Sequence, residues 1–175
     1  TEADESGTFT RVFPQLSDIL SGTSTKGEQF PSTNRSLNFR ATVRDHLGGT
    51  DGDDVLLTVV DTGADFEVTN LNSTTTLTGG ASQELTWNVA GTTANGINVS
   101  DVELLLSTDG GLTFPTSLAT TSNDGSHTLN LPNIDTTTAR FQIKAVDNIF
   151  FDITNANVTI AANGAAPGVS VIESG

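Results

Sequence analysis

The fold is decided by residues 85–106, which read LTWNVAGTTANGINVSDVELLL. Over Leu85–Val89 the apolar side chains alternate with polar ones, which is the period-two pattern of a half-buried strand. The turn signal Asn95-Gly96 follows, and the apolar run Val102–Leu106 is a second strand pattern. Two sheets of such strands bury their facing side chains, so Trp87 is predicted to anchor the core of a β-sandwich.

The same rhythm continues toward the C-terminal side of this stretch. Glycine-, asparagine- and proline-containing turns separate four further strand patterns, Ser126–Leu131, Ala139–Val146, Ile149–Ile153 and Val158–Ile160. About seven short strands in about 95 residues, with one tryptophan, are typical of an immunoglobulin-like or fibronectin-like sandwich. The sequence therefore predicts an all-β protein with such a domain over residues 66–161.

Residues 1–60 contain fewer strand patterns than a domain needs. The stretches Thr8–Phe13 and Leu37–Val43 are strand-like, and Asp54–Val60 is a continuous apolar run, as in a strand covered on both faces. A short helical turn is expected at Leu16–Leu20. Because three strands rarely bury enough surface to be stable alone, a partial β-sandwich module with missing strands is predicted. Such a module exposes edges that invite a strand from another chain.

The last residues, 162–175, form a linker followed by an orphan strand pattern. The linker is small and flexible by composition, and the pattern after it contains Val169, Val171 and Ile172. This pattern could begin a further module, or it could act as a donor strand for a neighbouring molecule.

Composition excludes several classes of function. The chain has 21 acidic and 7 basic residues and a net charge of −14, which repels nucleic acid phosphates and anionic membrane surfaces. No cysteine is present, so disulfides, thiolate metal sites and thiol catalysis are excluded. The two histidines, His46 and His127, have no nucleophile partner in the local sequence, and no GxSxG or SxxK motif occurs. We therefore predict a protein that is not an enzyme.

The most specific local motif follows the strand pattern Val102–Leu106. It resembles the Asp-box, SxDxGxTW, with Phe114 at the aromatic position, and its members are Ser107, Asp109, Gly111, Thr113 and Phe114. The Asp109 carboxylate can accept backbone N–H bonds within a tight hairpin, and glycine supplies a positive φ. In families that carry this motif it is structural, and we expect the same here.

An acidic, glycine-rich loop joins the two strand patterns of residues 37–60. Its carboxylates suit calcium, which takes six to eight oxygen ligands in irregular geometry. The spacing does not match an EF-hand, because the closing glutamate is missing. The alternative is a solvated hairpin tip in a chain that is acidic throughout. The candidate calcium ligands are Asp45, Asp51, Asp53 and Asp54.

Several longer strings suggest a family. Residues 11–20, RVFPQLSDIL, and 31–45, PSTNRSLNFRATVRD, resemble the later half of a β-sandwich module in the C-terminal region of large secreted bacterial zinc metallopeptidases of the reprolysin-like group. The module that follows it there is similar to LTWNVAGT at 85–92, LLSTDGGLTFP at 105–115 and ARFQIKAVDNIFFDIT at 139–154. The resemblance implies non-catalytic, immunoglobulin-like accessory modules of an exported protein. It does not imply peptidase activity, because nothing here matches that family's zinc-binding helix.

One departure from the family is informative. The family's first module has an earlier half with a tryptophan-bearing strand, which this chain lacks, so we expect Thr1 to fall inside a module. Two functions follow from the sequence. The first is a secreted, extracellular accessory or adhesion module that contacts neighbouring modules of the same protein. The alternative is a self-assembling extracellular fibre subunit whose like subunits are joined by β-strand complementation.

Overall fold

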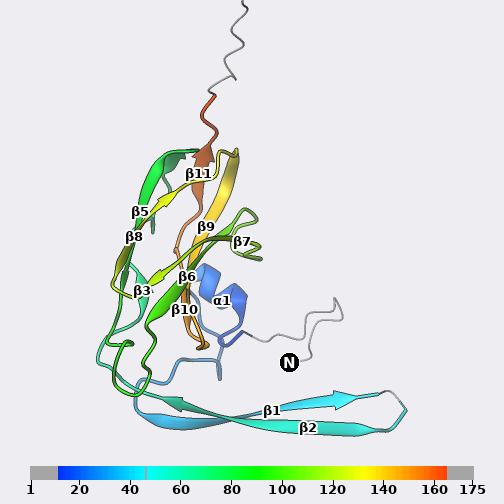
Figure 1. The fold of residues 1–175 in the computed structure, drawn as a ribbon. Helices are drawn as coiled ribbons and strands as arrows, with labels where there is room; N and C mark the ends of the chain where they lie inside the picture. The colour runs from blue at the N-terminus through cyan, green and yellow to red at the C-terminus, as the bar shows by residue number, and fades with distance from the viewer. Residues whose placement is uncertain (1–11, 46, 165–175) are drawn as a thin grey trace, which may run out of the picture. The chain divides into compact units, whose positions relative to one another are not determined.

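The computed structural model describes residues 12–45 and 47–164, and these residues are mostly β-structure (Figure 1). The chain forms two compact units. One contains the described residues up to Asp65 together with Ala90–Asn98, and the other contains Phe66–Val89 and the described residues from Val99 onward. Among the described residues, no helix is long and apolar enough to cross a membrane.

The second unit contains two sheets. The smaller sheet has three strands in the order β3-β5-β8, and both of its pairings are antiparallel. Its strands are β3 (Glu67–Val68), β5 (Ser82–Asn88) and β8 (Ser126–Asn130). β5 contains the tryptophan and the alternating side chains that predicted a half-buried strand, and Leu85 and Trp87 are both buried.

The larger sheet has six strands. Five follow one another in the order β4-β11-β9-β6-β7, and β10 pairs with β9 as well. The strands are β4 (Thr76–Thr78), β6 (Asp101–Ser107), β7 (Thr116–Ser122), β9 (Thr136–Ala145), β10 (Phe151–Ile153) and β11 (Val158–Ala161). All pairings are antiparallel except that of β4 with β11, which is parallel.

The connectivity of this unit is that of an immunoglobulin-like sandwich. Within this unit, the first strand, β3, belongs to the smaller sheet. The next strand, β4, belongs to the larger sheet, where it lies beside the last described strand, β11. β6 and β9 form the centre of the larger sheet, and β5 is the centre of the smaller one. The all-β, immunoglobulin-like β-sandwich predicted from the sequence is confirmed.

The core lies between the two sheets. The smaller sheet and the residue after β8 contribute Val68, Leu85, Trp87, Leu129 and Leu131. The larger sheet contributes Val102, Leu104, Leu106, Ala139, Phe141, Ile143, Val158 and Ile160. The Trp87 side chain is 4% exposed, and its indole N–H donates to the Asn123 Oδ1 at 2.9 Å. The one polar atom of the tryptophan is thus satisfied inside the core.

The first unit contains a short helix and a long hairpin. The helix α1 (Leu16–Ser21) is the helical turn predicted at Leu16–Leu20, and it ends at Gly22, which has a left-handed φ of 64°. The hairpin consists of β1 (Arg35–Arg44) and β2 (Thr50–Val59), which form a separate two-stranded antiparallel sheet (Figure 1).

Two predictions for this unit differ from the structure. The run Asp54–Val60 is not covered on both faces: the adjacent side chains of Val55 and Leu56, on opposite faces of β2, are 51% and 62% exposed. Among the described strands β2 pairs only with β1, in a sheet of two strands. Of the predicted strand Thr8–Phe13, only the last two residues are described, and neither belongs to a strand.

Candidate functional site

The β1–β2 hairpin has one apolar and one polar face. Ten residue pairs join the strands, from Arg35 opposite Val59 to Arg44 opposite Thr50, and opposed residues lie on the same face. The apolar face carries Leu37, Phe39, Ala41, Val43, Val55, Leu57 and Val59, with Asp51 and Asp53 near the tip and Arg35 at the base. On the polar face, the Arg40 guanidinium and the Asp54 carboxylate form an ion pair at 3.2 Å.

The apolar face is covered only in part. Near its base, Phe39 is half-buried, and the Phe13 ring packs edge-on against it with 5.6 Å between ring centroids. Toward the tip, Val43 is 70% exposed and Val55 is 51% exposed. Exposed apolar side chains that adjoin one another on one face of a sheet are typical of a surface that contacts a partner.

A groove of about 530 Å³ lies beside the covered part of the hairpin. Its walls combine aromatic rings with one arginine, and they include Phe13, Gln29, Phe30, Arg35, Leu37 and Phe39. Phe30 is 70% exposed, so the aromatic surface extends from the groove into solvent. The groove therefore presents aromatic rings within a wall that is mostly polar.

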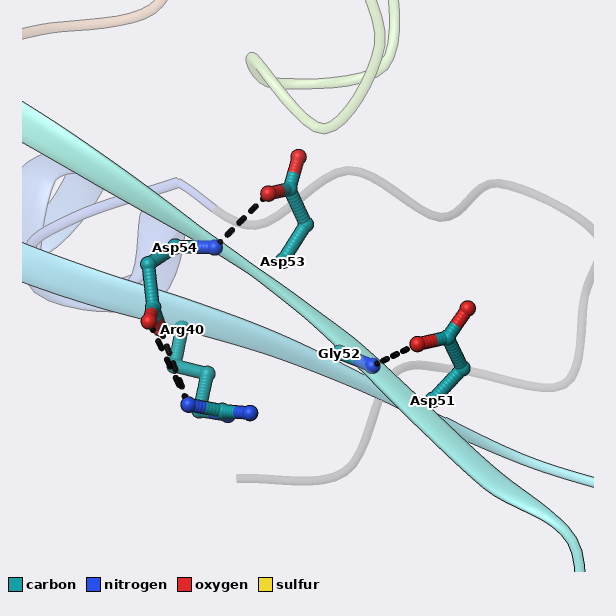
Figure 2. A network of polar contacts seen from close by, with 5 residues as sticks. All are labelled: Arg40, Asp51, Gly52, Asp53 and Asp54. Atoms are coloured by element: carbon teal, nitrogen blue, oxygen red, sulfur yellow. Dashed lines mark hydrogen bonds and ion pairs between the residues drawn. The ribbon is translucent and has the colours of Figure 1, made fainter.

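The candidate calcium ligands lie on this hairpin but bond separately. Asp51 and Asp53 each accept a hydrogen bond from the backbone N–H of the next residue, at 2.8 and 3.0 Å. Figure 2 shows their carboxylates on the other side of β2 from the pair formed by Arg40 and Asp54. Over residues 12–45 and 47–164, no three histidine or acidic side chains come together as a metal site.

Asp45, the fourth candidate, orders the turn between the two strands. Its Oδ1 accepts hydrogen bonds from the backbone N–H groups of Leu47 and Gly49, both at 2.8 Å. These bonds, that of Leu47 first, lower the pKa of the Asp45 carboxyl below its ordinary value. A Cβ at Gly49 would lie 2.5 Å from the Asp45 Oδ2, so the carboxylate approaches this glycine more closely than a side chain there permits. His46, in the same turn, lies outside the described residues.

Calcium binding by Asp45, Asp51, Asp53 and Asp54 stays a prediction. If the ion binds, millimolar calcium raises the thermal midpoint of the hairpin-containing protein, and a chelator reverses the rise. Magnesium at the same concentration is the control, because it demands a stricter octahedral site. Equal midpoints in calcium, magnesium and chelator would contradict the prediction.

The Asp-box residues form one hydrogen-bonded turn after β6. The fully buried Ser107 hydroxyl donates to the Asp109 Oδ1 at 2.6 Å and accepts from the Gly111 N–H at 2.9 Å. Asp109 also accepts from Thr113, through the backbone N–H at 3.0 Å and the hydroxyl at 2.6 Å. Gly111 has a φ of 95°, which explains why glycine stands there, and Phe114 is half-buried. All polar members of the motif are used in holding the turn.

The turn gives a testable pH dependence. Hydrogen bonds from the Ser107 hydroxyl and then from Thr113 lower the pKa of the Asp109 carboxyl far below its ordinary value of 3.8. Because the folded pKa is the lower one, the unfolded chain binds more protons in acid. The stabilisation is therefore complete above about pH 3.8 and decreases as the pH falls toward the folded pKa.

We expect Asp109→Asn to lower stability at pH 7 and to flatten the loss of stability between pH 5 and about pH 2. Urea unfolding at a series of pH values, followed by tryptophan fluorescence, measures both effects. Asp124→Asn is the matched control, because Asp124 accepts only a 3.4 Å bond from the Ser126 N–H in its turn. An unchanged pH dependence in Asp109→Asn would contradict the expectation.

The remaining candidates lie elsewhere. Val169, Val171 and Ile172, the candidate donor strand, lie outside the described residues. His127 is in β8, as its strand pattern predicted, and its Nδ1 shares a 3.0 Å hydrogen bond with the Thr121 hydroxyl. That bond joins β8 to β7 within the sandwich and leaves His127 with a structural role.

Sequence reasoning missed the distribution of charge between the two hairpin strands. β1 contains three arginines and no acidic residue: Arg35, Arg40 and Arg44. β2 contains three aspartates and no basic residue: Asp51, Asp53 and Asp54. The signal was present in the sequence, but it acquires meaning only when the outer edges of both strands are known to be unpaired among the described residues.

No protein-family model and no curated protein matches the chain, so the functional conclusion depends on this geometry.

Proposed function

We propose that the chain is a non-catalytic, extracellular accessory or adhesion module of a larger secreted bacterial protein, and that it binds neighbouring modules of that protein by strand pairing. The observation that carries this proposal is the hairpin β1–β2. Both of its outer edges are unpaired among the described residues, and its apolar face is open toward the tip.

Physical chemistry supports strand pairing at this hairpin. An isolated two-stranded sheet is at best marginally stable in water, and further strands or a packed layer stabilise it. An unpaired edge presents backbone N–H and C=O groups that a partner strand can satisfy. Since the strands are ten residues long, a partner would gain a long ladder of backbone bonds. The apolar side chains of the open face would add burial to that ladder.

The extracellular and bacterial parts of the proposal are supported by the sequence strings that resemble accessory modules of reprolysin-like metallopeptidases. The acidic, cysteine-free surface agrees with a role in which stability comes from packing and strand pairing, because no disulfide is available.

Cell fractionation tests the proposal. An antibody raised against the chain is expected to detect it in the culture medium, or on intact cells in a form that added protease removes. The purified protein is expected to leave peptide and glycoside substrates unchanged. Detection in the cytoplasmic fraction alone, or turnover that copurifies with the chain, would refute the proposal.

A second candidate function is a self-assembling extracellular fibre subunit joined by β-strand complementation. The observation that favours it is that the hairpin has two open edges. A sheet open on one side can accept a single partner, whereas a sheet open on both sides can join a partner on each and grow.

A further inference from the structure

We propose that the outer edge of β1 in one copy of the chain pairs antiparallel with the outer edge of β2 in a second copy, head to tail. The inference deepens the second candidate function, the fibre subunit, and rests on it, and it names the two strand edges that meet. The surface is the pair of open hairpin edges in residues 35–44 and 50–59.

Charge complementarity selects this arrangement. The charged side chains of β1 are all positive, namely Arg35, Arg40 and Arg44, and the charged side chains of β2 are all negative. Pairing two β1 edges or two β2 edges would place three like charges on each of two strands about 4.7–4.9 Å apart. Such symmetric pairing is repulsive, whereas pairing β1 with β2 places a positively charged edge beside a negatively charged one, with Arg40 directly opposite Asp54 in the register of the hairpin. The charges therefore disfavour a closed two-fold dimer and favour a contact that repeats.

The hairpin itself provides the register for the contact. Within one chain, β1 and β2 already match over ten residue pairs, with Arg40 opposite Asp54. If a second copy repeats this register, each Arg40 lies between two Asp54 carboxylates, one from each chain. Phe39 then lies opposite Val55 of the next copy, as it lies opposite Val55 of its own. The apolar face becomes continuous from copy to copy, which buries side chains that are now exposed.

The overall charge of −14 opposes association, but most of these charges are farther from the contact than the charges on the two paired strands. At physiological ionic strength the Debye length is about 8 Å, so charges farther apart than this are largely screened. Neighbouring strands in a sheet are closer than that length. The local attraction between β1 and β2 therefore survives in a buffer that weakens the general repulsion between two copies.

A charge-reversal exchange tests the proposal. In R35E/R44E both edges become negative, and in D51K/D53K both become positive. Both variants keep Arg40 and Asp54, so the ion pair that joins the strands within the hairpin remains. K26E/K144E is the control for R35E/R44E, because it makes the same change in net charge at two exposed lysines outside the hairpin.

Sedimentation velocity at physiological salt over a range of concentrations gives the result. We expect species larger than the 18.2 kDa chain in the wild type and in the control. Each reversed variant alone is expected to need at least about a threefold higher concentration for the same degree of association, because two edges of like net charge then meet. An equimolar mixture of the two reversed variants is expected to associate again. Such recovery also shows that both variant hairpins are folded.

Three results would overturn the proposal: a wild type that stays at 18.2 kDa at every concentration, reversed variants that associate as the wild type does, or a mixture that does not recover. None of them bears on the extracellular location or on pairing with a different module. Cell fractionation decides the location independently, so the two proposals can fail separately.

Discussion

Replacing Phe141 by alanine is expected to lower the free energy of unfolding of the sandwich by about 3–5 kcal/mol. Phe141 lies in β9, at the centre of the larger sheet, and its side chain is fully buried. Its removal leaves a cavity against the smaller sheet in addition to the lost transfer free energy. A loss of this size is a large fraction of the stability of a single domain, so the variant is expected to be partly unfolded at 37 °C.

Urea unfolding followed by tryptophan fluorescence measures the effect, because Trp87 is the only tryptophan and lies in the same core. Phe30→Ala is the matched control: it is the same chemical change at a side chain that is 70% exposed and lies in the other unit. The control is expected to shift the transition of Trp87 by less than about 0.5 kcal/mol. Equal losses in the two variants would show that the sandwich core is not where the structure places it.

The second large effect is expected at Asn123, which is buried in the turn after β7. Its Oδ1 accepts the indole N–H of Trp87 at 2.9 Å, and its Nδ2 donates to the Val99 carbonyl at 3.2 Å. Asn123→Ala leaves the indole N–H buried without this acceptor, which costs about 1–3 kcal/mol, and the loss of the second bond adds to that.

The indole provides a direct readout of this change. In Asn123→Ala we expect a lower unfolding midpoint together with a changed emission maximum of Trp87 in the folded state, since its hydrogen-bond partner is gone. Asn155→Ala, at an exposed position between β10 and β11, is the matched control and is expected to alter neither. Destabilisation with unaltered Trp87 emission would argue against the hydrogen bond.

The strands of the sandwich were predictable wherever a sheet buries one face. Leu85 and Trp87 alternate with polar residues in the sequence, and both are buried in β5. β7 was missed, because Thr116–Ser122 lies at the edge of its sheet and contains only two apolar residues, Leu118 and Ala119. An edge strand buries little, so selection for an alternating pattern is weak there.

In the hairpin the strand was predicted correctly, but its burial was not. The apolar run at Asp54–Val60 correctly indicated a strand, and the inference that it is covered on both faces was wrong. Sequence reports which side chains are apolar, but burial depends on whether another sheet packs on them. Val55 and Leu56 of β2 are apolar, yet more than half of each is exposed.

The two candidate sites, the Asp-box and the calcium site, also differ in how far the sequence alone can predict them. The Asp-box spans seven residues from Ser107 to Thr113, so a local turn alone brings its hydrogen-bonding groups together. A calcium site needs the directions of several side chains to agree, and strand alternation sends Asp53 and Asp54 to opposite faces of β2. Residue type is readable from the sequence, whereas convergence of side chains is a property of the fold.

The parallel pairing of β4 with β11 has a mechanical consequence. These are an early and the last strand of the sandwich, so tension between Thr76 and Ala161 pulls them in opposite directions along their length. Their hydrogen bonds lie across that pull, among them Thr159 N–H to the Thr75 carbonyl at 2.8 Å and Gly79 N–H to the Ala161 carbonyl at 2.7 Å. Such bonds are loaded together and must be sheared at once, whereas a hairpin pulled at its open end separates one bond at a time. A sandwich built this way resists stretching along the chain.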